Sequence, residues 1–176
     1  MNRLPGGSAR TFARWRVTGG FVVAVVMLVL ARPTWESLGA GFVIAAIGES
    51  LRVWASGHLE KGREVTRSGP YRFVRHPLYA GSMVMALGVA VASRGAVPAL
   101  VAGLYMGVTI LAAVQVEEEQ LRQAFGPTYD DYAASRGEPM RRRFSMARAM
   151  RNREYRAVAG LFLGFALLAL KILAPL

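Results

Sequence analysis

Long apolar stretches recur along this chain, separated by short basic or glycine-containing stretches. Several are shorter than the roughly 20 residues that a straight helix needs to cross a bilayer, so flanking residues must complete them. Because backbone groups in lipid must be hydrogen-bonded within the segment, we expect each stretch to be a helix. The pattern predicts an all-α fold, a polytopic membrane bundle of about five transmembrane helices, at about Val17–Ala31, Leu38–Gly57, Leu78–Ser93, Ala96–Val116 and Val158–Ala174.

The third and fourth apolar segments are separated only by Ser93-Arg94-Gly95, which predicts a tight antiparallel helical hairpin. In such a hairpin the start of the third helix and the end of the fourth lie at the same membrane face. We also interpret two Gly-x-x-x-Gly spacings as helix-packing sites, because glycine lets helix backbones approach closely. They are Gly103/Gly107 and Gly160/Gly164.

The composition fits one membrane domain over residues 1–176. Hydrophobic residues make up 53% of the chain, and the mean hydropathy is +0.31. The length suits one compact bundle rather than two domains. The chain contains no cysteine, which rules out disulfides, thiolate metal sites and a cysteine nucleophile, and we predict no metal site.

Basic residues outnumber acidic ones, giving a net charge of +11, and they flank the apolar segments. This placement favours anionic lipid head groups over nucleic acid as partners. With the N-terminus in the cytoplasm, eighteen of the 22 basic residues fall on the cytoplasmic side. The positive-inside rule therefore predicts a cytoplasmic N-terminus and a non-cytoplasmic C-terminus, in a bacterial-type inner membrane or its equivalent.

The ends of the apolar pattern leave two questions open. Residues 1–31 also resemble a signal peptide with a cleavage site at Val29-Leu30-Ala31, but we favour a retained span, since Arg32-Pro33 is unfavourable for cleavage. The arginine-rich residues 136–156 contain Phe144, Met146 and Met150. They predict either a cytoplasmic surface segment that touches head groups or a solvated basic linker.

A basic loop runs into the third apolar segment at Arg75-His76-Pro77-x-Tyr79. Proline has no N–H and a fixed φ, so Pro77 fits the first turn of a helix and places His76 at its mouth. The N–H groups of that turn, together with the Arg75 guanidinium, would favour a carboxylate. The alternative is boundary chemistry, with a capping histidine, an interfacial tyrosine and an arginine that reaches the head groups.

Three glutamates, Glu117-Glu118-Glu119, follow directly on the fourth apolar segment. They could hold an ammonium group or a positively charged cofactor, and the alternative is a solvated helix end. The predicted hairpin would bring them to the face that carries His76.

Other polar residues accompany these two motifs. Glu49 and Arg52 are three residues apart inside the second segment and share a helix face, so they form either a packing ion pair or a polar wall of the site. Tyr129 and Tyr132 are expected on a short amphipathic helix that lies against the bundle.

These motifs together resemble the superfamily of isoprenylcysteine carboxyl methyltransferases and phospholipid methyltransferases. The similarity covers about residues 38–135, and the basic segment 136–156 and a further span at 158–174 lie beyond this core. It rests on Arg52-Val53-Trp54-Ala55, Gly69-Pro70-Tyr71, Arg75-His76-Pro77-x-Tyr79 and Glu117-Glu118-x-x-Leu121-x-x-x-Phe125-Gly126-x-x-Tyr129-x-x-Tyr132.

The resemblance implies an integral membrane enzyme that uses S-adenosylmethionine. It implies that His76 and Tyr79 contact the cofactor, with Pro77 shaping the turn, and that Glu117 or Glu118 holds the methionine ammonium group. The cofactor supplies the reactive carbon, while the protein supplies position and charge.

The resemblance also implies that Arg75 binds a carboxylate or orients a lipophilic acceptor, so Arg75 and Glu118 are the predicted catalytic residues, with Glu119 the weakest candidate. Prenylated proteins, phospholipid amines and small lipophilic acids or thiols all fit as acceptors, and none of the motifs specifies an oligomeric state. Two other classes remain open: an NADPH-dependent enzyme similar to sterol reductases, and a non-enzymatic membrane protein that binds anionic lipid.

Overall fold

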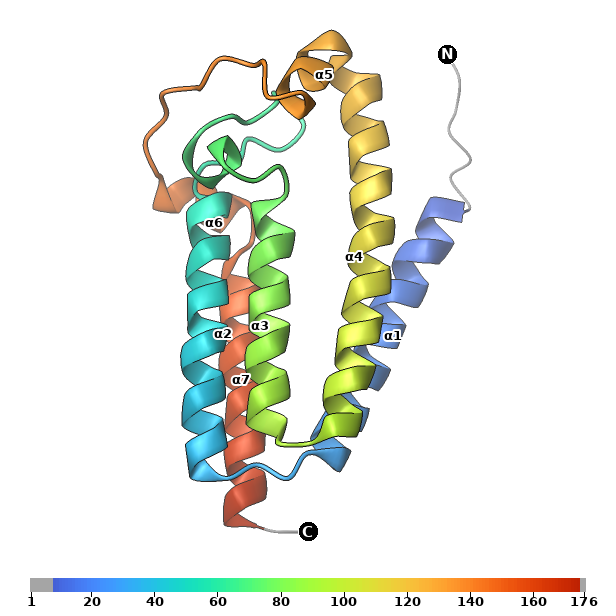
Figure 1. Ribbon diagram of the computed structural model, residues 1–176, viewed down its shortest axis with the longest axis vertical. Helices are drawn as coiled ribbons and strands as arrows, with labels where there is room; N and C mark the ends of the chain where they lie inside the picture. Colours follow the sequence, from blue (N-terminus) through green and yellow to red (C-terminus); the bar gives the residue numbers. More distant parts are fainter. Residues whose placement is uncertain (1–7, 175–176) are drawn as a thin grey trace.

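The computed structural model describes residues 8–174, with side chains from Thr18 onward. Five long helices run side by side and three short ones gather at one end (Figure 1). The described residues contain no strand, which confirms the predicted all-α membrane bundle. The long helices are α1 (Ser8–Leu30), α2 (Trp35–Ser56), α3 (Pro77–Ser93), α4 (Ala96–Phe125) and α7 (Tyr155–Leu173), and the short ones are η1 (Gly69–Arg72), α5 (Pro127–Ala133) and α6 (Met146–Arg151).

The long helices differ in their capacity to cross a membrane. By length and composition, α2, α4 and α7 are each apolar and long enough to span it alone. The apolar part of α1, Thr18–Leu30, and all of α3 are shorter, as expected for segments completed by their flanking residues. The chain is therefore an integral membrane protein.

The closest contact between helix backbones joins α2 to α3. A Cβ atom added to Gly48 would lie 2.6 Å from the Gly81 carbonyl oxygen, and one added to Gly88 would lie 2.5 Å from the Ala45 nitrogen. The predicted short connection between α3 and α4 is present, and the two helices run antiparallel (Figure 1). The tight partner of α3 is nevertheless α2 rather than α4.

The two predicted Gly-x-x-x-Gly packing sites are wrong. A Cβ atom on any of these four glycines would meet no heavy atom within 4 Å, so none of them lets two backbones touch. Small residues permit a close approach, but a second small residue on the facing helix is also needed, and within the described part of the chain α2 and α3 supply both. The four glycines are Gly103, Gly107, Gly160 and Gly164.

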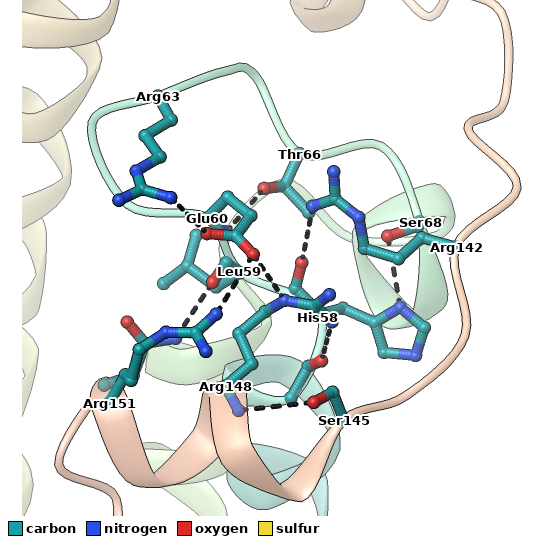
Figure 2. A network of polar contacts seen from close by, with 12 residues as sticks. His58, Leu59, Glu60, Arg63, Thr66, Ser68, Arg142, Ser145, Arg148 and Arg151 are labelled. Carbon is teal, nitrogen blue, oxygen red and sulfur yellow. Dashed lines mark hydrogen bonds and ion pairs between the residues drawn. The ribbon is translucent and has the colours of Figure 1, made fainter.

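The end of the bundle that holds η1, α5 and α6 is tied together by ion pairs (Figure 2). We call residues 138–152 the strap, because this segment returns from α5 to the loop that follows α2. Arg148 of the strap donates from Nε to Glu60 at 2.7 Å, and Arg142 donates from Nη2 to Glu64 at 2.8 Å. Both arginines are partly buried, so the solvated-linker interpretation of this segment is wrong for them.

His58 lies beneath the strap and helps to fix the loop that leads to α3. Its Nδ1 atom is 3.1 Å from the Ser68 hydroxyl, and the Phe144 ring packs nearby, with centroids 6.4 Å apart. Burial, with the charges of Arg148 and Arg142 adding to it, lowers the pKa of His58 below its ordinary value. The loop therefore holds a neutral imidazole at neutral pH.

Candidate functional site

The loop before α3 is shaped so that His76 meets the start of the helix. Gly69 has a φ of +57°, and a Cβ atom there would lie 2.5 Å from the His58 ring, so this turn requires glycine. Pro77 then begins α3, and the His76 carbonyl accepts hydrogen bonds from the Tyr79 and Ala80 nitrogens, both at 3.1 Å. His76 is the N-cap residue of α3, but its side chain makes no capping hydrogen bond and is therefore available to another partner.

Glu118 on α4 is the partner of His76. The Glu118 Oε1 atom lies 3.0 Å from His76 Nε2 and 3.3 Å from Arg75 Nη1, and Oε2 lies 3.6 Å from Arg122 Nη2. The side chains of His76 and Glu118 are only 16% and 17% exposed. The two motifs therefore meet at one end of the bundle, as the sequence predicted, and one carboxylate holds three donor groups.

The other predicted site residues take different positions. The ring of Tyr79 stacks at an angle on His76, with centroids 5.9 Å apart, and Pro77 is buried beneath them. Glu117 is partly buried and makes no ion pair or side-chain hydrogen bond within the described part of the chain. Glu119 is exposed and accepts a hydrogen bond from Gln123, four residues along the same helix.

Helix α5 covers the site with two tyrosines, as predicted for a short amphipathic helix. Tyr129 is 1% exposed, and the Arg122 guanidinium lies 5.7 Å from its ring centroid. The Tyr132 hydroxyl donates to the Tyr71 carbonyl at 2.9 Å. Burial raises the pKa of Tyr132 to about 12, and burial together with Glu118 raises the pKa of Tyr129. Both phenols therefore stay protonated and form walls of the site, and Tyr132 also donates a hydrogen bond.

The predicted pair of Glu49 and Arg52 has a third member that sequence reasoning missed. Arg52 Nε lies 3.6 Å from Glu49 but donates at 2.8 Å to Glu154, which lies just before α7. Arg52 also donates from Nη1 to the Ser82 hydroxyl on α3 at 2.5 Å. Glu154 is one of only two acidic residues, with Glu138, among the arginines of residues 136–156, and an acid within a basic run is the signal that could have revealed it.

An apolar cavity of about 510 Å³ lies between α1, α3, α4 and α7. Its walls include Met27, Met85, Tyr105 and Phe165, and almost all of its lining is hydrocarbon. Gly160 and Gly164 of α7 line it as well, so these glycines border a space rather than a neighbouring backbone. A hydrocarbon chain of a membrane lipid matches this lining.

The fold and the site define an integral membrane bundle with a His–Glu pair held between two helix ends. A family model described as phospholipid methyltransferase matches residues 15–128 of the chain. That range holds both motifs and most of the bundle, so the chain belongs to the phospholipid methyltransferase family.

Curated proteins similar to this chain carry two kinds of names. The nickel-cobalt-cadmium resistance protein NccN of Alcaligenes xylosoxydans xylosoxydans is 29% identical over 133 residues, which cover 68% of this chain and 59% of that protein. The cobalt-zinc-cadmium resistance protein CzcN of Cupriavidus metallidurans is 29% identical over 126 residues, which cover 68% of this chain and 58% of that protein.

A probable protein-S-isoprenylcysteine O-methyltransferase of Oryza sativa subsp. indica is 30% identical over 111 residues, which cover 56% of this chain and 58% of that protein. The chain thus spans less than two thirds of the length of the curated relatives it matches. No solved structure matches it significantly. Among the residues that the structure describes, no three His, Asp or Glu side chains are grouped so that they could hold a metal ion.

Proposed function

We propose that this protein is an S-adenosylmethionine-dependent methyltransferase that acts on a lipophilic acceptor at the membrane surface. The observation that carries the proposal is the 3.0 Å contact between His76 Nε2 and Glu118 Oε1, which joins the two family motifs. Arg75 shares the same carboxylate oxygen. A cation, an imidazole and a carboxylate are thereby concentrated where α3 begins and α4 ends.

The side chains present fit the charged groups of this cofactor, and they favour one glutamate over the other for its ammonium group. Glu118 already holds His76, Arg75 and Arg122, so its acceptor capacity is largely used. Glu117 is partly buried and has no such partner among the described residues, which leaves a carboxylate to accept an ammonium group. We assign the ammonium contact to Glu117 and the ordering of His76 and Arg75 to Glu118.

The cofactor, when bound, supplies an electrophilic methyl group on a sulfonium, and the protein need only position the acceptor in line with it. Arg75 is half exposed, so the part of its guanidinium that does not contact Glu118 can face an acceptor. The protonated Tyr129 and Tyr132 cover the site and limit the entry of water. The apolar cavity between α1, α3, α4 and α7 supports a lipophilic acceptor, because its hydrocarbon lining suits an alkyl or prenyl chain.

Binding of labelled S-adenosylmethionine to the full chain in detergent tests this function. Wild type should bind, and His76→Ala and Glu118→Ala should each bind at least about tenfold more weakly, the loss of roughly one charge-assisted hydrogen bond. Glu119→Ala is the matched control, since this neighbouring carboxylate is exposed and bonds only to Gln123. A methyl-transfer assay on total lipid extract and prenylcysteine analogues then identifies the acceptor class.

Four results would contradict the proposal. The first is no binding by wild type, and the second is binding by the His76 and Glu118 variants that is as tight as that of wild type. Preferential binding of NADPH would instead favour the sterol-reductase-like class. Binding of anionic lipid with no methyl transfer to any acceptor would favour the non-enzymatic class.

A further inference from the structure

A second cavity, of about 260 Å³, lies beside the candidate site and has the opposite character to the apolar one. Arg67, Arg72 and Arg75 line it from the loop before α3, and Tyr132 and Gly137 line it from the segment that begins with α5. None of its lining residues is acidic. Such a cavity has room for more than a single water, whose share of liquid volume is about 30 Å³.

Two of the three arginines of this cavity have no acidic partner in the described chain. Arg67 and Arg72 form no ion pair there, and the Nε atom of Arg67 is buried without a hydrogen-bond partner. Arg72 only approaches the neighbouring Phe73 ring, at 6.0 Å. A buried guanidinium N–H without an acceptor is unfavourable, so these donors are suited to an anion that the chain does not itself provide.

Arg67 is held in place rather than extended into solvent. The Met140 nitrogen of the strap donates to the Arg67 carbonyl at 3.2 Å. A Cβ atom added to Gly137 would lie 3.0 Å from Arg67 Nη1 and 3.2 Å from Arg67 Cδ, so the side chain packs directly on this glycine. The Tyr132 hydroxyl is already bonded to the Tyr71 carbonyl, and the guanidinium groups are the charged donors of the cavity.

We propose that this cavity binds an oxyanion, a phosphate or a carboxylate, carried by the head group of the methyl acceptor. Guanidinium groups match both anions through paired N–H donors. Arg75 lines the cavity and also contacts Glu118, so an anion bound here lies next to the residues assigned to the cofactor. The exposed rings and side chains of Phe73 and Val74 at the rim suit the apolar part of such a molecule.

Anion binding itself is independent of the proposed function, and only the assignment to the acceptor rests on it. The first measurement is therefore the thermal midpoint of the full chain in uncharged detergent, with inorganic phosphate exchanged for chloride at constant ionic strength. Phosphate should stabilise the wild type, because a ligand that binds only the folded state raises its midpoint. Arg67→Gln should raise the apparent Kd for phosphate by about tenfold or more.

Arg63→Gln is the matched control. Arg63 belongs to the same loop, but its side chain is 80% exposed, and it lies 3.9 Å from Glu60, away from the cavity. Gly137→Ala provides a variant without a change of charge, and it should weaken phosphate binding by displacing the Arg67 side chain. If Arg67→Gln does not fold, Gly137→Ala and Arg67→Lys keep the test available.

The remaining arms identify the source of the anion. Three kinds of nanodisc are compared. Phosphatidylglycerol supplies a phosphate, an uncharged galactolipid supplies no anion, and galactolipid with added fatty acid supplies a carboxylate. The site assignment predicts that Arg67→Gln loses stabilisation by the anionic discs, while in the galactolipid discs, where no anion is present, it binds S-adenosylmethionine as wild type does. A loss of cofactor binding in the galactolipid discs would overturn the assignment to the acceptor, since the anion would then be the cofactor's carboxylate.

No stabilisation of wild type by phosphate or by any anionic disc would overturn the anion site, even where methyl transfer is normal. Conversely, anion binding that depends on Arg67 without any cofactor binding would refute the proposed function and leave the anion site standing.

Discussion

Replacing Glu154 by alanine should destabilise the bundle strongly, because it removes the main partner of a partly buried guanidinium. Arg52 on α2 donates to Glu154 at 2.8 Å and to Ser82 on α3, so this one side chain joins three helices. The Arg52 and Glu154 side chains are 20% and 7% exposed, respectively. The pair therefore lies where solvent screens it little.

The magnitude follows from what remains after the substitution. Removing one partner of a buried ion pair leaves the other charge uncompensated, at a cost of about 3–5 kcal/mol. Glu49 still lies 3.6 Å from Arg52 and keeps part of the attraction, so we expect the lower end, about 3 kcal/mol. For a chain of this length, that is a fall of roughly 6–12 °C in the thermal midpoint. Glu154→Gln keeps a hydrogen-bond acceptor and should cost less.

Intrinsic tryptophan fluorescence during thermal unfolding in detergent measures the change. The control is Asp131→Ala, because the Asp131–Arg136 pair is 54% and 68% exposed and should contribute about 0–1 kcal/mol. A double substitution, Arg52→Met with Glu154→Leu, should be less destabilised than Glu154→Ala alone, since no charge is left unpaired. Equal shifts in the thermal midpoint for Glu154→Ala and Asp131→Ala would refute this reasoning. So would a double variant whose loss of stability equals the sum of the losses caused by Arg52→Met and Glu154→Leu alone.

Three further predictions concern packing, pH and topology. Gly48→Ala should lower stability by about 1–3 kcal/mol in an unfolding assay, since its Cβ would overlap the α3 backbone, whereas Gly103→Ala, with open space around it, should not lower it. Stability should fall as the pH is lowered below about 6.5 and through the depressed pKa of His58, because the unfolded chain binds a proton on this imidazole more readily than the folded chain. His58→Gln should reduce the dependence of stability on pH in this range, and an unchanged dependence would contradict the assignment. A reporter fused after Leu176 should report the non-cytoplasmic side, and a cytoplasmic signal would invert the proposed topology.

The bundle and the meeting of its two motifs could be predicted from the sequence because each depends on strong local signals. Apolar length determines where helices lie, since lipid offers no other partner for backbone groups. The short Arg94-Gly95 connection then places the start of α3 and the end of α4 at one end of the bundle. That constraint was enough to bring His76 to Glu118 before any side-chain contact was known.

The partner of each helix could not be predicted in the same way, because a small residue shows only that one face permits close approach. The glycines that form the α2–α3 contact repeat at a spacing of seven, with Gly41 and Gly48 on one helix and Gly81 and Gly88 on the next. A matching repeat on two successive segments is therefore a better indicator of a backbone contact than a single Gly-x-x-x-Gly spacing. The fourfold spacings on α4 and α7 have no such counterpart facing them.

Long-range ion pairs escaped prediction for a different reason. The Arg52–Glu154 contact and the strap contacts to Glu60 and Glu64 join residues from distant parts of the chain. A basic segment has the same composition whether its arginines face solvent, lipid or carboxylates. Its structure depends on where the few acidic residues of that end of the bundle lie, and this is a property of the fold rather than of the segment.

Arg75 connects the two proposed sites and implies that their ligands are coupled. It lines the arginine cavity and lies 3.3 Å from Glu118, while its own side chain is half exposed. An anion in the cavity would draw the guanidinium partly away from Glu118 and leave more negative charge at the end of α4 for an ammonium group. Anion and cofactor should therefore favour each other's binding. By linkage, the factor by which the anion raises the affinity for the cofactor equals the factor by which the cofactor raises the affinity for the anion. A site built this way would hold the cofactor most tightly when the head group of an acceptor is already in place.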